Sequence, residues 1–387
     1  MIEYTNKDIL PAGMCDVLPP DAEIEATATE QLIACFSSFG YERVKPPLIE
    51  FEESLLSGGG AAMAGQTFRI MDPISQRMMG VRTDMTMQVA RIAATRLKKR
   101  ARPTRLCYGG QVLRVRGSQI RPERQFGQVG SELIGSHSPK ADLEVILMAV
   151  DALSSLGIEN LSIDVALPTL VPSVLRDLNL DNQILVNLHS ILDRKDESAL
   201  DSLASQIDKE TINLLKALLR TTGPAESALK SIAKLKLPKI AAAECAVLGS
   251  VVNDIQTAAS DLNLTIDLVE SRDLKYHTGI TFTIFAKSVR GELGRGGRYF
   301  TGERGVKNSE PATGITLFMD SILRAIPASK EIGRLYIPIE MDVYEARKFR
   351  KEGWITINGL ESIGNTKTEA KRLGCSHFIS NGKIQKI

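Results

Sequence analysis

No apolar run in this 387-residue chain approaches the roughly 20 residues that a membrane-spanning helix needs. The first residues, Met1-Ile2-Glu3, also lack the basic and then apolar layout of a secretory signal peptide. We therefore expect a cytoplasmic protein that has no membrane partner.

Cysteine is scarce as well, and no two cysteines have the C-x-x-C spacing of a zinc or redox site. The chain holds five, namely Cys15, Cys35, Cys107, Cys245 and Cys375. Cys375 lies close to His377, but no further metal ligands accompany this pair. We expect reduced, mostly buried thiols, and neither a disulfide framework nor a bound metal.

Charge and aromatic side chains give little sign of nucleic-acid binding, since the net charge is only +2 and aromatic residues make up 5% of the chain. One dense basic run, RLKKRAR at residues 96–102, is the exception. It has two interpretations: the solvated end of a helix, which we favour, or a patch that attracts phosphate-bearing ligands.

The N-terminal half alternates between helical and strand-like patterns. Apolar residues at helical spacing predict helices at 21–39 and 140–156, and the prolines of segment 44–50 predict an extended conformation there. Short runs of β-forming residues separated by turns predict one antiparallel sheet between residues 67 and 135. Its expected strands cover residues 67–71, 78–81, 106–116 and 128–134.

The C-terminal half begins with residues 172–262, whose almost wholly helical pattern predicts an inserted helical piece. β-Branched and aromatic residues then predict a strand at 280–286. We expect a glycine-rich turn at 291–299 and a helix at 314–326. Residues 333–387 alternate between short strands and helices, which is typical of a small α/β domain.

Several motifs give a specific resemblance. The segment LRVRGSQIRPERQFGQVGSE, at residues 113–132, resembles the second signature motif of class II histidyl-tRNA synthetases, with matching spacing throughout. Further segments resemble this family in the family's own order: PAGMCDVLPP (11–20), the region around Pro47, RTDMT (82–86), RDLKYHTG (272–279) and GRGGRY (294–299). Each match alone is weak, but the shared order of all of them argues against coincidence.

The resemblance implies an α+β fold, in which an antiparallel sheet flanked by helices is joined by a helical insertion and a small C-terminal α/β domain. The synthetase-like core would comprise residues 1–171 and 263–327, and the insertion would comprise 172–262. Residues 333–387 resemble a truncated anticodon-binding domain.

The resemblance also implies a histidine pocket. Its residues would be Asp84, Thr86, Arg114, Gln128, Glu132, Arg272, Tyr276 and His277. These residue types suit the ligand, because carboxylates accept from an ammonium group or an imidazole N–H, and a guanidinium binds a carboxylate. The alternative is that the polar side chains only pair with one another inside the sheet. His277 stands where the family usually has a second tyrosine.

The ATP-binding residues of the family are mostly replaced. The family uses an arginine and a glutamate of the second motif and an arginine of the third, and the resemblance places Arg114, Arg116 and Ser321 at these positions. Losing such a phosphate contact costs roughly 2–5 kcal/mol when its partner charge stays buried. We favour Arg116 as a partner of an acidic surface residue over a clamp for another phosphate ligand. Phe300 also replaces the usual aspartate after the glycine-rich stretch.

A synthetase-like fold with an incomplete ATP site resembles the regulatory subunits that partner the short form of ATP phosphoribosyltransferase. The resemblance implies a chain without catalytic residues or cofactor, which activates that catalytic subunit in the first step of histidine biosynthesis and mediates feedback inhibition by histidine. It implies a homodimer through the synthetase-like core, around residues 21–50, within a larger hetero-oligomer. tRNA is not expected as a partner, because residues 333–387 offer few aromatics and mixed charge. An active histidine-adenylating enzyme and a free-standing amino-acid sensor remain as alternatives.

Overall fold

The computed structural model describes residues 9–56, 58–119, 121–178, 180–270, 276–302, 309–327, 333–380 and 382–387. The chain forms two compact units, Met1–Ile326 and Pro327–Ile387. The finer boundaries that we expect within the first unit, at residues 171 and 262, stay a prediction.

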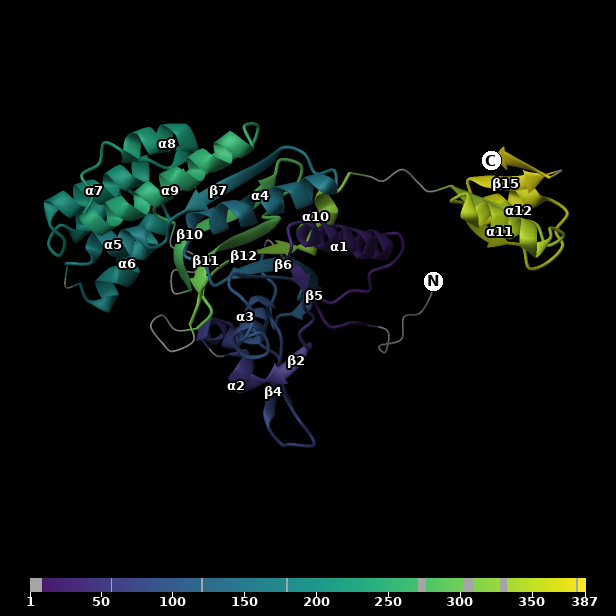
Figure 1. The fold of residues 1–387 in the computed structure, drawn as a ribbon, viewed down its shortest axis with the longest axis horizontal. Helices are drawn as coiled ribbons and strands as arrows, with labels where there is room; N and C mark the ends of the chain where they lie inside the picture. Colours follow the sequence, from purple (N-terminus) through teal and green to yellow (C-terminus); the bar gives the residue numbers. More distant parts are fainter. Residues whose placement is uncertain are drawn as a thin grey trace. The chain divides into compact units, whose positions relative to one another are not determined.

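A nine-stranded sheet runs through the first unit in the order β1-β5-β6-β12-β11-β10-β7-β9-β8 (Figure 1). The strands are β1 (Glu42–Arg43), β5 (Thr104–Leu113), β6 (Gln125–Ile134), β7 (Leu161–Ala166), β8 (Gly223–Pro224), β9 (Asn263–Asp267), β10 (His277–Ala286), β11 (Gly294–Phe300) and β12 (Pro311–Phe318). The central strands pair antiparallel, whereas β1 with β5 and β7 with β9 pair parallel. The predicted antiparallel sheet flanked by helices is confirmed.

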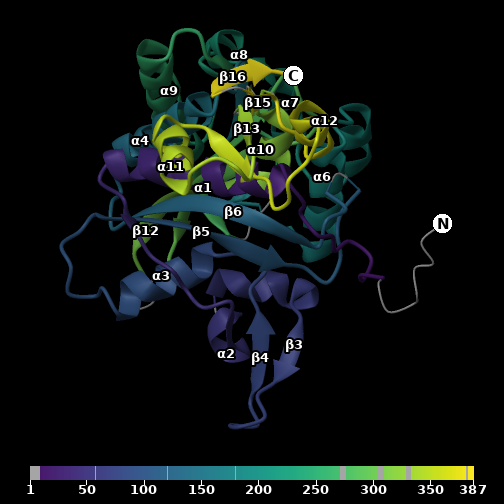
Figure 2. The same ribbon diagram turned by 90° about the vertical axis from the view of Figure 1, so that its right-hand side faces the viewer.

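Helices cover both faces of this sheet (Figures 1 and 2). They include α1 (Asp21–Ser38), α3 (Thr86–Thr95), α4 (Pro139–Ser155) and α10 (Met319–Ala325). Successive side chains of a strand point to opposite faces, so β5 contributes to two separate cores. Cys107 packs into the large apolar cluster with residues of α1 and α4. Leu106 and Tyr108 pack on the other face, in the cluster that holds residues of α3.

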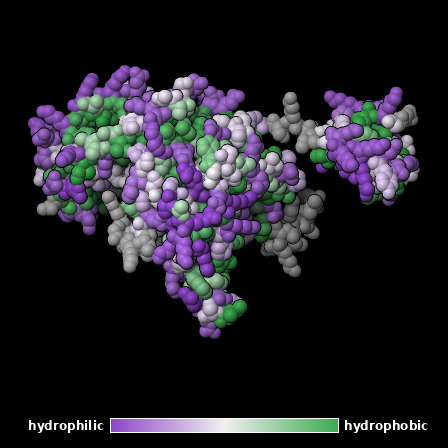
Figure 3. Space-filling view, in the orientation of Figure 1, coloured by the Kyte–Doolittle hydropathy of each residue, from purple (hydrophilic) through white to green (hydrophobic). Residues whose placement is uncertain are grey.

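A separate three-stranded sheet has the order β2-β4-β3. It comprises β2 (Ile49–Phe51), β3 (Arg69–Met71) and β4 (Met78–Val81), with α2 (Glu52–Leu55) and the 3-10 helix η1 (Gly58–Gln66) between β2 and β3. The β3–β4 hairpin projects from the unit (Figure 2) and exposes apolar side chains (Figure 3), among them Ile70, Met71, Ile74 and Met78. The prediction of one sheet across residues 67–135 is therefore wrong, because only β5 and β6 join the nine-stranded sheet.

Residues 172–262 are mostly helical, as their pattern predicts, except for β8, which pairs with β9. The helices of this region are α5 (Leu170–Leu175), α6 (Asn182–Asp193), η2 (Ser198–Leu203), α7 (Lys209–Arg220), α8 (Ala225–Ile232) and α9 (Lys239–Ala258). Their apolar faces extend the large cluster under α1 and α4. Within the described ranges, no helix combines the length and apolar character that a bilayer crossing requires.

Two segments differ from their predicted structure. The expected glycine-rich turn at 291–299 is largely strand β11, and the expected helix at 314–326 begins as strand β12 and turns helical only at α10. The glycines of β11 allow close strand packing, whereas Gly291 lies in the bend before this strand with a φ of +99°. A Cβ at Gly296 would collide with the carbonyl oxygen of Gly314 and the ring of Phe282, so glycine lets the neighbouring strands approach.

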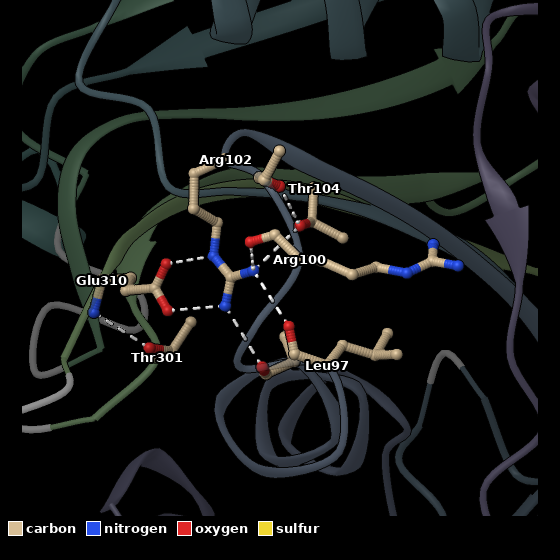
Figure 4. A network of polar contacts seen from close by, with 8 residues as sticks. Leu97, Arg100, Arg102, Thr104, Thr301 and Glu310 are labelled. Atoms are coloured by element: carbon tan, nitrogen blue, oxygen red, sulfur yellow. Dashed lines mark hydrogen bonds and ion pairs between the residues drawn. The ribbon is translucent and has the colours of Figure 1, made fainter.

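The basic run at 96–102 follows α3, and Arg102 ties it to the sheet (Figure 4). Its guanidinium donates to three main-chain carbonyl oxygens at 3.1–3.2 Å, those of Ala93, Leu97 and Arg100. It also forms an ion pair with Glu310, just before β12, with 2.9 Å between Nη2 and Oε1. The run therefore fits the end of a helix, where a cation neutralises the exposed carbonyl groups.

The second unit contains a four-stranded sheet of order β14-β13-β15-β16. Its elements are β13 (Arg334–Ile337), α11 (Val343–Lys351), β14 (Ile355–Asn358), α12 (Thr366–Arg372), β15 (His377–Ser380) and β16 (Lys383–Lys386). Strands and helices alternate here as the sequence predicts. Leu335 and Tyr336, adjacent on β13, belong to two small apolar clusters.

Candidate functional site

A cavity of about 150 Å³ lies on the α3 face of the nine-stranded sheet. The predicted site residues that line it are Asp84, Thr86, Arg114, Glu132, Tyr276 and His277. Gln128 does not line it but contacts Asp84, and Arg272 lies outside the described residues. The cavity is smaller than the roughly 300 Å³ at which pockets for drug-sized ligands begin, so it suits a small metabolite.

Glu132, on β6, is the most deeply buried carboxyl of the cavity, at 1% exposure. The hydroxyls of Tyr108 and Tyr299 donate to it at 3.1 and 2.7 Å. Gly314 lies opposite on β12, where a Cβ would collide with the carboxylate. Burial raises the pKa of Glu132 to about 8, so the protein alone keeps this carboxyl mostly protonated at neutral pH.

Asp84 stands just before α3 and is held by its neighbours. The side-chain amide of Gln128 donates to Asp84 Oδ2 at 3.0 Å, and the main-chain N–H of Thr86 donates to Asp84 Oδ1 at 2.8 Å. The Thr86 and Tyr108 hydroxyls are 3.1 Å apart, which links this group to Glu132. The predicted residues are thus brought together, and they do pair with one another, as the alternative interpretation requires. We name Asp84, Thr86, Tyr108, Glu132 and Tyr299 the amino-acid end.

Tyr276 and His277 form the wall beside this end. The ring of Tyr276 stacks on Tyr299, with 5.0 Å between centroids and 23° between planes. Its hydroxyl is buried and has no hydrogen-bond partner among the described residues. His277 Nδ1 lies 3.3 Å from the carbonyl oxygen of Arg298 on β11. The wall thus offers an unsatisfied hydroxyl that a ligand could engage.

Two arginine side chains also line the cavity. Arg114 and Arg295 both line it, and the Arg114 guanidinium lies over the Phe126 ring, 5.0 Å from the centroid. Burial lowers the pKa of Arg114, and the neighbouring Arg295 lowers it further. Sequence reasoning missed Arg295, whose position inside the glycine-rich segment was its only signal.

Ser321, the position that the resemblance matches to the family's third-motif arginine, lies beside an ion pair. Arg121 forms an ion pair with Asp320 at 2.9 Å, and its guanidinium lies 3.9 Å from the centroid of Phe318. Its Nη2 is 3.5 Å from the hydroxyl of Ser321, which is buried. Arg116 is exposed, and its side chain forms no ion pair within the described part of the chain, so the favoured surface pairing is not seen. We name Arg116, Arg121, Asp320 and Ser321 the nucleotide end.

Known proteins share this fold and sequence. The family model of histidyl-tRNA synthetase matches residues 13–322. An ATP phosphoribosyltransferase regulatory subunit from Paramagnetospirillum magneticum is 50% identical over 387 residues, which cover 100% of both chains. This alignment spans both compact units.

Two solved structures share the fold. One, described as an ATP phosphoribosyltransferase regulatory subunit/histidyl-tRNA synthetase from Bacillus halodurans, has a TM-score of 0.79 at 23% identity and covers 95% of this chain and 97% of that one. A chain of the ATP phosphoribosyl transferase (HisG:HisZ) complex from Thermotoga maritima has a TM-score of 0.60 at 18% identity and covers 76% of this chain and 97% of that one. The chain therefore belongs to the histidyl-tRNA synthetase family and, within it, to the ATP phosphoribosyltransferase regulatory subunits.

Proposed function

We propose that this chain is the non-catalytic regulatory subunit of an ATP phosphoribosyltransferase. It assembles with a short-form catalytic subunit, activates it, and conveys feedback inhibition by histidine in the first step of histidine biosynthesis. One structural observation carries the proposal: the nucleotide end is closed by an internal ion pair between Arg121 and Asp320. The full-length identity with a regulatory subunit supports it.

The ion pair disfavours ATP for an energetic reason. Arg121 and Asp320 are only 11% and 8% exposed, and the carboxylate already neutralises the guanidinium that lies nearest to Ser321. A triphosphate could recruit Arg121 only by separating this pair. Breaking a buried ion pair costs about 3–5 kcal/mol, so Arg121 is not a free cation that could hold the triphosphate for adenylation.

We infer that the ligand of the cavity is L-histidine. The amino-acid end offers two carboxyl groups, Asp84 and Glu132, and Arg114 also lines the cavity. A zwitterion with an imidazole side chain matches this arrangement, because it carries both a cation and an anion. When the ligand binds, Glu132 would lose its proton and accept a hydrogen bond from a cationic or N–H group of the ligand. Its pKa of about 8 is close to neutral pH, so this loss of a proton costs little free energy.

We further propose a homodimer through the synthetase-like core around residues 21–50. Strand β2 is the edge of its three-stranded sheet, and an unpaired edge readily accepts a strand from a second chain. Leu48 and Ile49 are exposed there, which supplies apolar area for an interface. We expect Ile49→Glu to shift the molar mass measured by light scattering from dimer to monomer. Ile74→Glu at the hairpin tip is the control, and an unchanged dimer in both variants would rule out this interface.

The cytoplasm is the compartment that we propose for this complex. All five cysteines are free thiols, and three of them are buried. Free thiols are the usual state in a reducing compartment, which supports this placement.

Reconstitution tests the proposed function. A purified short-form catalytic subunit is assayed for phosphoribosyl transfer from phosphoribosyl pyrophosphate to ATP, alone and with this chain, in the presence and absence of histidine. We expect activity to rise on addition of the chain and to fall again with histidine. Unchanged activity, together with no co-elution of the two proteins, would overturn the proposal and favour a free-standing sensor.

A further inference from the structure

Two arginines approach the cavity from different strands, and only one of them belongs to the predicted site. Arg114 directly follows β5, and Arg295 stands on β11 between Gly294 and Gly296. Both line the cavity, and the charge of Arg295 lowers the pKa of Arg114 because like charges repel. Arg114 already has a proposed role toward histidine, whereas Arg295 has none.

Arg114 is poorly satisfied by the protein itself. Its Nε is buried and has no hydrogen-bond partner among the described residues, and no carboxylate forms an ion pair with it there. The nearest site carboxylate, Asp84, is already bound by Gln128 and by the main-chain N–H of Thr86. A buried N–H group that lacks a partner is costly, and on a guanidinium that lines a cavity it is consistent with an anionic ligand.

Arg121 provides the internal contrast. Phe126 and Phe318 pack edge to face with 6.3 Å between their centroids. The guanidinium of Arg121 lies over both rings, that of Arg114 lies over Phe126, and that of Arg295 lies over Phe318. The charge of Arg121, however, is neutralised by Asp320. Arg121 does not line the cavity, whereas Arg114 and Arg295 do. The protein therefore supplies a carboxylate to the guanidinium outside the cavity and leaves the buried Nε of Arg114 without one.

We propose that Arg114 and Arg295 form an oxyanion subsite on the wall of the cavity, and that its occupant is the carboxylate of the bound amino acid. An oxyanion beside the two guanidiniums can accept from the buried Nε of Arg114 and offset the repulsion between the two positive charges. Arg295 is then the residue that distinguishes an amino acid from the same molecule lacking its carboxylate. This inference rests on the proposed histidine ligand, and inorganic phosphate is the other source of the same chemistry.

Isothermal titration calorimetry tests the subsite with three probes: L-histidine, histidinol, in which an alcohol replaces the carboxylate, and inorganic phosphate. Each is titrated into the full-length protein, into Arg295→Gln and into Arg295→Lys. Arg290→Gln is the matched control, because Arg290 is exposed in the turn between β10 and β11 and does not line the cavity.

Wild type and the Arg290→Gln control should bind histidine about 10- to 100-fold more tightly than histidinol, the range expected for one charge-assisted contact. Arg295→Gln should lose most of this preference, and Arg295→Lys should keep part of it. An undiminished preference in Arg295→Gln would overturn the carboxylate assignment while leaving histidine as the ligand.

The phosphate titration separates the two sources. Phosphate binding that depends on Arg295 while histidine fails to bind the wild type would support the oxyanion subsite and refute the proposed histidine ligand. Binding of none of the three probes to the wild type would overturn the subsite itself.

Discussion

The amino-acid end and the nucleotide end differ in how their charged side chains are paired. At the amino-acid end, Glu132 still sits beneath two tyrosine hydroxyls, and Gly314 leaves space for its carboxylate. At the nucleotide end, Arg121 forms an ion pair with Asp320 and also approaches the Ser321 hydroxyl. One end therefore keeps groups that a ligand can engage, whereas the other has become a structural contact.

Under the proposed function, the nucleotide site is inactive because its arginine is paired with an internal carboxylate, and not because arginines are absent. Arginine is still abundant near Phe318, so a count of cations would suggest that phosphate can bind. Whether an arginine can bind phosphate depends on whether its guanidinium is already paired with a carboxylate of the protein. This distinguishes Arg121, which is paired, from Arg114, whose Nε has no hydrogen-bond partner among the described residues.

The largest expected change in stability comes from removing the ion pair between Arg121 and Asp320. Arg121→Ala should lower the free energy of unfolding by about 3 kcal/mol, because the buried Asp320 would keep only its longer contact with Arg324, at 3.6 Å. Urea denaturation measures the change. Arg100→Ala is the control, since it breaks an exposed pair with Glu42 that should contribute only about 0–1 kcal/mol. Equal losses in the two variants would show that the Arg121 pair is not a structural contact.

The next prediction concerns the pH dependence of stability, which reports on the burial of Glu132. Its folded-state pKa is about 8, whereas an unfolded glutamate titrates near 4.3, so the folded state holds the extra proton between these values. The contribution of this proton to the free energy of unfolding is then fully present below about pH 4.3 and is lost as the pH rises through 8. Relative to Glu132→Gln, which cannot ionise, wild type should lose about 2–3 kcal/mol between pH 6 and pH 8. Parallel stability curves for the two proteins would mean that Glu132 is not buried as described.

A smaller effect should follow from removing one donor at the amino-acid end. Tyr299→Phe deletes the hydroxyl that donates to Glu132 at 2.7 Å and should cost about 1–2 kcal/mol in the free energy of unfolding. Tyr344→Phe, at an exposed position, is the control and should be neutral. Thermal unfolding monitored by circular dichroism compares the variants, and a neutral Tyr299→Phe would argue against this hydrogen bond.

The smallest effect is expected at Arg116. Restoring the family's charge with Arg116→Glu should change stability by less than about 0.5 kcal/mol, because the side chain is exposed and unpaired within the described ranges. It should also leave ATP binding undetectable by calorimetry, since Arg121 and Asp320 still occupy the nucleotide end. ATP binding gained by this single change would mean that Arg116 alone blocks the site.

Much of the fold follows from local patterns in the sequence. The helix predicted at 21–39 is α1, and the strand predicted at 78–81 is β4, because apolar spacing and β-forming residues act over a few positions. The resemblance also placed Asp84, Thr86 and Glu132 around one cavity. These predictions depend on short segments or on motifs with fixed spacing.

What the sequence did not reveal depends on partners distant in the chain. Glycines in segment 294–299 look like a turn until the neighbouring strands β10 and β12 are in place. Arg121 and Asp320 are 199 residues apart, so no local pattern indicates their pairing. Tyr108 was likewise missed, although its hydroxyl connects Thr86, Glu132 and Thr316, because a tyrosine in a strand usually signals core.

Histidine-dependent exchange between ATP and pyrophosphate, measured with the purified chain alone, tests the loss of the nucleotide end most directly. With Arg121 held by Asp320, we predict exchange no faster than in a reaction without protein. Exchange at the rate of an ordinary synthetase would contradict the account, because it would require the chain to hold ATP for adenylation.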